Sequence, residues 1–298
     1  MTAIGAQAKV VAARCQAALQ AALASVEAVA PTRWLVRVSR ASESSVLVRL
    51  VDGFLVLADA FSPAARVPRW DLLKANASLL GLAKISAAPS GGLCLRAEIP
   101  VQADCNLPLR ITQACDAFAA AQDPTRAGQG TIGITPAEAA APDLPKLVSA
   151  AGWRCSSPGG EICAVPLATR QGGHTAIVTA PAGAVRICAE LVSWDALSEP
   201  CRDGLASMLL TANARLRLAR AIVDENESGG AAQLEVLFQA PVAPVELRSA
   251  LEALSVGADA CASAADLLQE EAAAKLFLAV WGGPQGREDT KPSIERKR

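Results

Sequence analysis

The sequence has few of the side chains that perform chemistry. Among its 298 residues there is no Tyr and only one His, and aromatic residues make up 3%. A nucleophile activated by histidine would depend on His174, which follows two glycines and has no orienting partner indicated by spacing. The shortage of aromatic rings also leaves few platforms on which unpaired bases could stack. We therefore expect neither a histidine-based enzyme nor a base-stacking protein.

An excess of charge of one sign is also missing. Lys and Arg number 28 and Asp and Glu 29, which gives a net charge of −1, and the two signs are interspersed. Binding to nucleic-acid phosphates needs clustered Lys and Arg. No window holds about 20 uninterrupted apolar residues, as a transmembrane helix requires. Gln16, Gln20 and Glu27 interrupt the apolar N-terminal stretch, which disfavours a secretory signal. We expect a protein of the bacterial cytoplasm that contacts neither nucleic acid nor membrane.

Motifs for metals and cofactors are absent as well. The nine cysteines include no C-x-x-C pair, and His174 has no cysteine within four residues, whereas zinc ligands usually come in close pairs. The glycines of residues 128–133 neither follow a strand nor open a helix, as a phosphate-binding loop would. We expect reduced, buried thiols, no cofactor and no metal.

The hydrophobic content of 52% supports a folded core, and the length suggests two domains. Residues 123–142 are rich in Pro, Gly and Ala and lack periodicity, which is typical of a linker, and residues 282–298 are charged and predict a disordered tail. The expected domains are residues 1–122 and residues 143–281.

In the first domain the apolar residues change period along the chain. A spacing of three and four predicts a helix over residues 3–29, which Pro31 ends. Alternation then predicts three strands near residues 34–38, 46–50 and 54–58, with a hairpin at Asp52-Gly53. A helix over 70–80, strands over 84–87 and 93–99 and a helix over 107–122 complete this domain.

A long-range repeat links the two domains. Residues 72–77 (LLKANA) and 209–214 (LLTANA) share five of six residues at an offset of 137, at which Ile85 also matches Ile222. A Gly-Gly pair follows in each domain, at 91–92 and at 229–230. The strands that come next, 93–99 and 234–240, match at an offset of 141 and each ends at a proline. The second domain also begins with a short helix over 143–151 and strands near 162–167, 175–179 and 185–191. We therefore expect a tandem duplication.

The element order α-β-β-β-α-β-β-α, with the Leu-Leu-x-Ala-Asn-Ala helix, the Gly-Gly turn and the strand that ends in Pro, resembles the class I type III secretion chaperones and the related bacterial YbjN-like family. The resemblance covers residues 3–122 and 143–281. It implies compact α+β modules with antiparallel sheets and no catalysis, which pair as dimers and hold an extended segment of a partner. Two modules on one chain imply a monomer with internal pseudo-two-fold pairing, that is, a covalent pseudo-dimer.

The resulting hypothesis is a non-enzymatic, chaperone-like protein that binds an extended segment of another protein at strand edges and apolar pockets. Two alternatives remain: a regulatory or structural scaffold, and an enzyme with no recognisable motif. Aromatic residues dominate binding energies at interfaces, and arginines on the outward side of the first strand are further candidates. The candidate partner-binding residues are Trp34, Trp70, Trp153, Trp194, Arg33 and Arg37.

Overall fold

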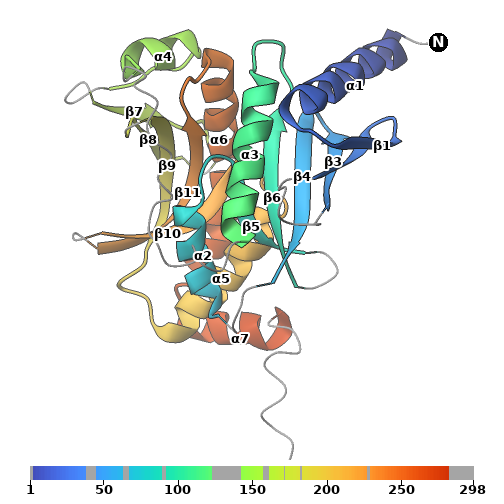
Figure 1. Ribbon diagram of the computed structural model, residues 1–298. Helices are drawn as coiled ribbons and strands as arrows, with labels where there is room; N and C mark the ends of the chain where they lie inside the picture. Colours follow the sequence, from blue (N-terminus) through green and yellow to red (C-terminus); the bar gives the residue numbers. More distant parts are fainter. Residues whose placement is uncertain are drawn as a thin grey trace, which may run out of the picture.

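The computed structural model describes residues 3–37, 45–62, 67–88, 92–122, 142–156, 161–170, 172–181, 183–226 and 229–281. Within these ranges the chain forms seven helices and two antiparallel sheets, which confirms the α+β class (Figure 1). The expected linker, apart from Pro142, and the expected tail lie outside the described residues.

The first half of the chain forms a six-stranded sheet in the order β1-β2-β3-β4-β6-β5. Helix α1 packs on α3, and α3 packs on β6. The elements of this half are α1 (Ala3–Ala22), β1 (Val26–Ala30), β2 (Arg33–Arg37), β3 (Ser45–Val51), β4 (Phe54–Phe61), α2 (Arg69–Ser78), β5 (Ala83–Ala87), β6 (Leu93–Pro100) and α3 (Leu107–Gln122).

The second half forms a five-stranded sheet in the order β10-β11-β9-β8-β7. Helix α6 packs on β9, β11 and the short helix α4. The elements of this half are α4 (Leu144–Ala150), β7 (Ile162–Pro166), β8 (Thr175–Thr179), β9 (Ala184–Ser193), α5 (Glu199–Asn213), β10 (Arg220–Asn226), β11 (Gly229–Gln239), α6 (Pro244–Leu267) and α7 (Glu271–Trp281).

The N-terminal prediction needs a correction. The helix ends at Ala22 instead of running to residue 29, and Val26–Ala30 forms strand β1, antiparallel to β2. The β-branched Val26 and Val29 favour a strand, and the turn at Pro31-Thr32 folds the chain back for pairing. The first half therefore has four strands before α2, not three. The second half has the expected order and adds α7 at its end.

The predicted hairpin at Asp52-Gly53 is confirmed between β3 and β4. Both turn residues have positive φ, +49° for Asp52 and +78° for Gly53, as a two-residue turn between twisted strands requires. The turn sets the register in which Val46, Val48 and Leu55 join the buried face of the sheet.

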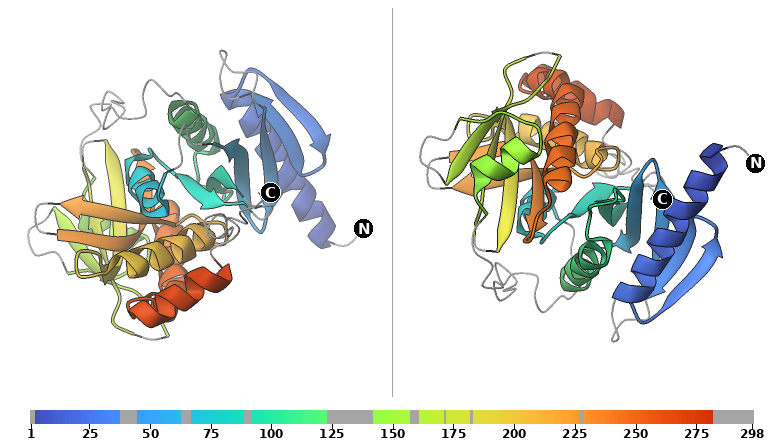
Figure 2. Two further views of the ribbon diagram at one scale, coloured as in Figure 1. Left: turned by 90° about the horizontal axis from the view of Figure 1, so that it is seen from below. Right: turned by 90° about the horizontal axis from the view of Figure 1, so that it is seen from above.

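The two halves lie side by side and exchange contacts through their central helices (Figure 2). Helix α2 of the first half lies against β10 of the second, α5 of the second lies against β5 of the first, and α2 and α5 pack on each other. The buried apolar residues of both halves form one continuous core. The halves are therefore joined by an extensive internal interface.

Candidate functional site

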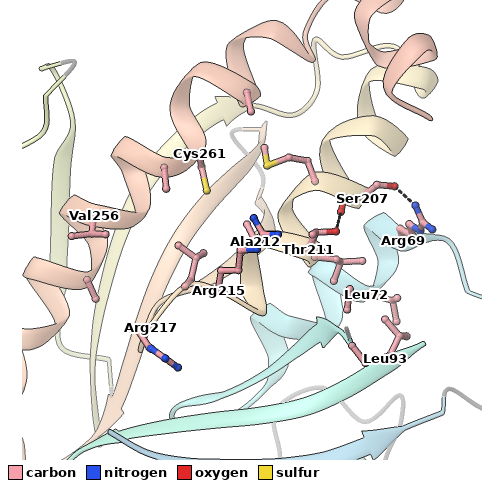
Figure 3. A pocket seen from close by; sticks show the side chains of 18 of the residues that line it. Arg69, Leu72, Leu93, Ser207, Thr211, Ala212, Arg215, Arg217, Val256 and Cys261 are labelled. Carbon is pink, nitrogen blue, oxygen red and sulfur yellow. Dashed lines mark hydrogen bonds between the residues drawn. The ribbon is translucent and has the colours of Figure 1, made fainter. Parts of the chain in front are cut away.

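An open cavity of about 1110 Å³ lies where the helices of the two halves converge, and we call it the groove (Figure 3). Its walls come from α2, α5, α6 and α7, and the ends of β5 and β6 complete it. Most of its lining is apolar, including Leu72, Met208, Val256 and Phe277. This volume slightly exceeds the range of about 300–1,000 Å³ that is typical of small-molecule pockets.

Close packing of α7 on α5 builds one wall of the groove. A Cβ atom on Gly204 of α5 would lie only 3.3 Å from the Cβ of Ala274 on α7. The small size of these two residues therefore allows the helices to lie close together. The ion pair between Lys275 and Glu271 spans one turn of α7. Phe277 and Trp281 then line the groove from α7, and Trp281 is 73% exposed.

A second wall is the outward flank of α6. Gly257 allows α6 to lie close to β11, because a Cβ atom there would approach Leu234 Cδ1 to 2.8 Å. The neighbouring Val256 points away from this contact into the groove and is 69% exposed. The same flank carries small residues at Ser249, Ala253, Ala260 and Ala264.

Helices α2 and α5 form the remaining wall and are tied to each other across the two halves. Arg69 of α2 donates a hydrogen bond to the Oγ of Ser207 on α5. Thr211, one turn further along α5, donates to the carbonyl of Ser207 at 2.9 Å. Leu72 projects into the groove beside them.

Charged residues at the groove are mainly basic. Arg69, Arg215 and Arg217 contribute to the lining, whereas Glu252 is the acidic residue among the lining side chains. Arg217 is paired with Asp52 at 3.3 Å. Arg215 is exposed and forms no ion pair with any residue that the structure describes. The groove therefore combines an apolar lining with a net positive charge.

Next to the groove, two buried asparagines join the halves, and we call this junction the seam. Asn76 Nδ2 donates to the carbonyls of Ile85 at 3.1 Å and Ala221 at 3.3 Å. Asn213 Nδ2 donates to the same two carbonyls, at 3.1 Å and 3.4 Å. In return the amide of Ile85 donates to Asn76, and that of Ala221 donates to Asn213. Each asparagine thus satisfies backbone groups of both halves in a fully buried position.

A buried ion pair of the first half also belongs to the seam. Lys84 and Glu98 are 2.6 Å apart, and the ammonium of Lys84 donates to the carbonyls of Leu216 and Ala219 in the second half. Burial lowers the pKa of Lys84 from its ordinary value, and the Glu98 carboxylate opposes that shift.

A second buried pair makes the reciprocal contact. Arg220 pairs with Glu235 in the second half, and its guanidinium donates to the carbonyls of Gly81 and Ala83 in the first half. The charges of the seam are thus neutralised and hydrogen-bonded across the junction, as buried charges require.

A further buried ion pair links the first turns of α3 and α6. Arg110 donates to both carboxylate oxygens of Glu246, at 2.7 Å and 2.8 Å, and to the carbonyl of Pro241 at 2.7 Å. Glu246 also accepts from the amide of Ala243, which caps the start of α6. Both charged side chains are almost fully buried.

The predicted partner-binding residues lie outside the groove. Trp34 and Trp194 are each 1% exposed and belong to the buried apolar core. Trp70 and Trp153 are half-buried against the core. Arg33 and Arg37 are exposed on β2, on the side opposite Trp34. None of these six residues lines the groove.

The residues considered for chemistry include His174 and the cysteines. His174 is half-buried, and its carbonyl accepts from the amide of Leu167. Burial raises the pKa of the thiols of Cys115 and Cys188 to about 12 and that of Cys261 to about 11, so these thiols are poor nucleophiles at neutral pH. No group of three or more His, Cys, Asp or Glu residues suited to a metal ion occurs among the described residues.

No protein-family model matches the chain. A search of curated proteins also finds no match. Among the residues that the structure describes, none of the helices has both the length and the apolar character needed to cross a membrane.

Proposed function

We propose that the chain consists of two related α+β modules packed as an internal pseudo-dimer. Support comes from strand order, since β2-β3-β4-β6-β5 and β7-β8-β9-β11-β10 follow the same path through their sheets. The central helices α2 and α5 each follow the third of these strands and each packs on the edge strand of the other half. This reciprocal packing is what a two-fold axis between two like modules would produce.

The asparagines of the seam are the second observation that supports two related modules, and they refine the alignment of one module with the other. Asn76 bonds the backbone of Ile85, and Asn213 bonds the backbone of Ala221 in the same manner. Ile85 therefore corresponds to Ala221, at an offset of 136, and not to Ile222. Leu95 pairs with Ile85 as Leu234 pairs with Ala221, which gives an offset of 139 in the next strand, two residues from the sequence match.

We further propose that the function is non-enzymatic and consists of holding an apolar segment of a partner protein. The observation that carries the proposal is the groove, together with the exposed apolar side chains along α6 and α7. Val256 and Trp281 line the groove and are each more than 60% exposed, and Leu276 and Val280 on α7 are exposed to a similar extent. Exposed apolar surface that is contiguous marks sites of interaction.

Strand edges are the other place where a partner segment could bind. The outer edge strands are β1 in the first sheet and β7 in the second. The backbone of Ser156 already pairs with Ala164 of β7 at 3.0 Å and 2.8 Å, and β1 has an irregular register between Ala28 and Ala30. These features blunt both edges. The groove is therefore the better candidate for the binding site.

The experiment measures the binding of fluorescein-labelled 16-residue peptides to the full chain by fluorescence anisotropy. The panel contains leucine-rich peptides of several patterns and polar peptides of equal length. Val256→Asp places a charge in the groove, and Val10→Asp is its matched control, because Val10 on α1 is 68% exposed and lies outside the groove.

We expect apolar peptides to bind the unmodified chain and Val10→Asp, and to bind Val256→Asp at least ten-fold more weakly. If no apolar peptide binds, or if both variants bind as the unmodified chain does, the proposed function is wrong.

A further inference from the structure

Most backbone groups of the described residues around the groove are already engaged. Its walls are helices, whose amides and carbonyls bond within the helix. Where strands reach the groove, β5 is the edge strand of its sheet, but the outward-facing backbone of Ile85 bonds Asn76 and Asn213, and the outward-facing carbonyl of Ala83 accepts from Arg220. At the end of α5, the carbonyl of Ala212 accepts from the amides of Arg215 and Leu216. Among the described residues, the groove thus offers an incoming chain at most one residue of open strand edge, at Ala87 of β5.

This arrangement constrains the conformation of a bound segment. An extended segment buried in the groove would lose water from most of its own amides and carbonyls without gaining backbone partners for them, and each such loss costs about 1–3 kcal/mol. A helix satisfies those groups internally and can present an apolar face to the walls. The geometry therefore favours a helical occupant.

The α6 wall also fits a helix in length and in surface. From Ser249 to Ala264 it spans 15 residue steps, which correspond to about 22 Å at 1.5 Å per residue. A partner helix of about four turns has the same length. The small side chains of Ala253 and Ala260 let helix axes come within about 8–10 Å. Val256 between them provides an apolar contact.

The charge of the groove lining restricts which residues the bound helix can carry. Arg69, Arg215 and Arg217 give the groove a positive balance against Glu252. Arg69 and Arg217 already bond Ser207 and Asp52, whereas Arg215 is exposed at the edge of the groove. A carboxylate on the occupant would complement Arg215, while a lysine there would be repelled.

On the basis of the proposed function, we propose that the groove binds an amphipathic α-helix of a partner protein, about four turns long, with small and apolar residues on one face and acidic residues beside it. The partner helix lies along α6, with its apolar face on Val256 and Trp281 and a carboxylate at Arg215.

The test uses three labelled 16-residue peptides with the same apolar positions. The first carries Glu at its flanking positions, the second carries Lys instead, and the third is the Glu peptide with a central proline that breaks the helix. Binding is measured by anisotropy, and helix formation by the circular dichroism of the unlabelled complex. We expect the Glu peptide to gain helicity on binding and to bind at least ten-fold more tightly than either other peptide.

Two substitutions at the groove, each with a matched control elsewhere, locate the effect. Ala260→Glu should weaken binding of the Glu peptide at least ten-fold, whereas Ala13→Glu, at an exposed alanine of α1, should leave it unchanged. Arg215→Glu should remove the preference for the Glu peptide over the Lys peptide, and Arg37→Glu should not.

Equal affinity of the proline peptide would overturn the helical occupant while leaving the proposed function intact. Equal affinity of the Lys peptide would overturn the acidic requirement, and failure of every peptide to bind would overturn the proposed function itself.

Discussion

Helix α5 belongs to two regions of opposite character. Its end carries Asn213 into the seam, where buried polar side chains bond backbone groups of both halves. Its middle carries Ser207 and Thr211 to the groove, where Val256 and Trp281 remain exposed although they are apolar. The seam is an interface between the two halves, whereas the groove leaves apolar side chains exposed, and we propose that a partner covers them. Substitutions should therefore cost stability at the seam and binding at the groove.

The largest effect should follow from removing one side of the seam altogether. Residues 1–122 expressed alone would expose α2, β5 and the charges of Lys84 and Glu98, all of which contact the second half. We expect this fragment to self-associate or aggregate, while the full chain is a monomer. Light scattering on both samples is the measurement. A monomeric, folded 1–122 fragment would mean that the halves are independent.

Arg110→Met should be the most damaging single substitution considered, because it leaves Glu246 buried without its counter-charge. Loss of one partner of a buried ion pair costs about 3–5 kcal/mol of unfolding free energy. Urea unfolding followed by circular dichroism measures this loss. Arg110→Met combined with Glu246→Leu serves as the control and should regain much of the stability. A loss below about 1 kcal/mol in the single variant would contradict the assigned role.

Asn76→Ala and Asn213→Ala should each lower the unfolding free energy by about 2 kcal/mol, since each leaves a buried backbone amide without its acceptor. The two losses should be similar, because the asparagines have equivalent partners. The double variant should deviate from additivity, because both side chains donate to the same two carbonyls. The measurement is again urea unfolding. A loss at only one position would break the equivalence of the halves.

Val256→Asp should have the smallest effect on stability. The side chain is 69% exposed, and surface substitutions generally change the unfolding free energy by less than about 0.5 kcal/mol. Thermal unfolding beside Val10→Asp checks this value. A loss of more than 2 kcal/mol would show that the groove wall is part of the core and not an open surface.

Much of the fold could be predicted from local sequence patterns. The Asp52-Gly53 hairpin, the helix over 107–122 and most strands follow from turn residues and from the period of apolar residues. The boundary after α1 was missed, because alanines continue from the helix into β1 and alanine favours a helix, although Val26 and Val29 favour a strand. Gly229 and Gly230 were expected in a turn but belong to β11, paired with Asn226 and Glu225.

The candidate site was harder to predict, because it depends on packing between distant segments. Asn76 and Asn213 were visible as matched polar positions in a shared helix, yet their common acceptors, Ile85 and Ala221, are defined only by the assembled halves. The tryptophans are candidates because aromatic side chains dominate binding energies at interfaces. Their burial depends on the tertiary structure, and Trp34 and Trp194 lie in the core. Groove residues such as Val256 and Ala260 belong to no sequence motif. The one signal that could have pointed to them is an apolar residue on the side of the α6 helix that faces away from the core.

Helix α7 has a consequence for stoichiometry. It follows α6 in the second half, whereas among the described residues no helix stands between α3 and α4 in the corresponding place of the first half. A symmetric homodimer of one module would have two copies of every binding surface. A single chain with α7 on one side builds this groove wall once, so a protein that binds there is expected at one copy per chain.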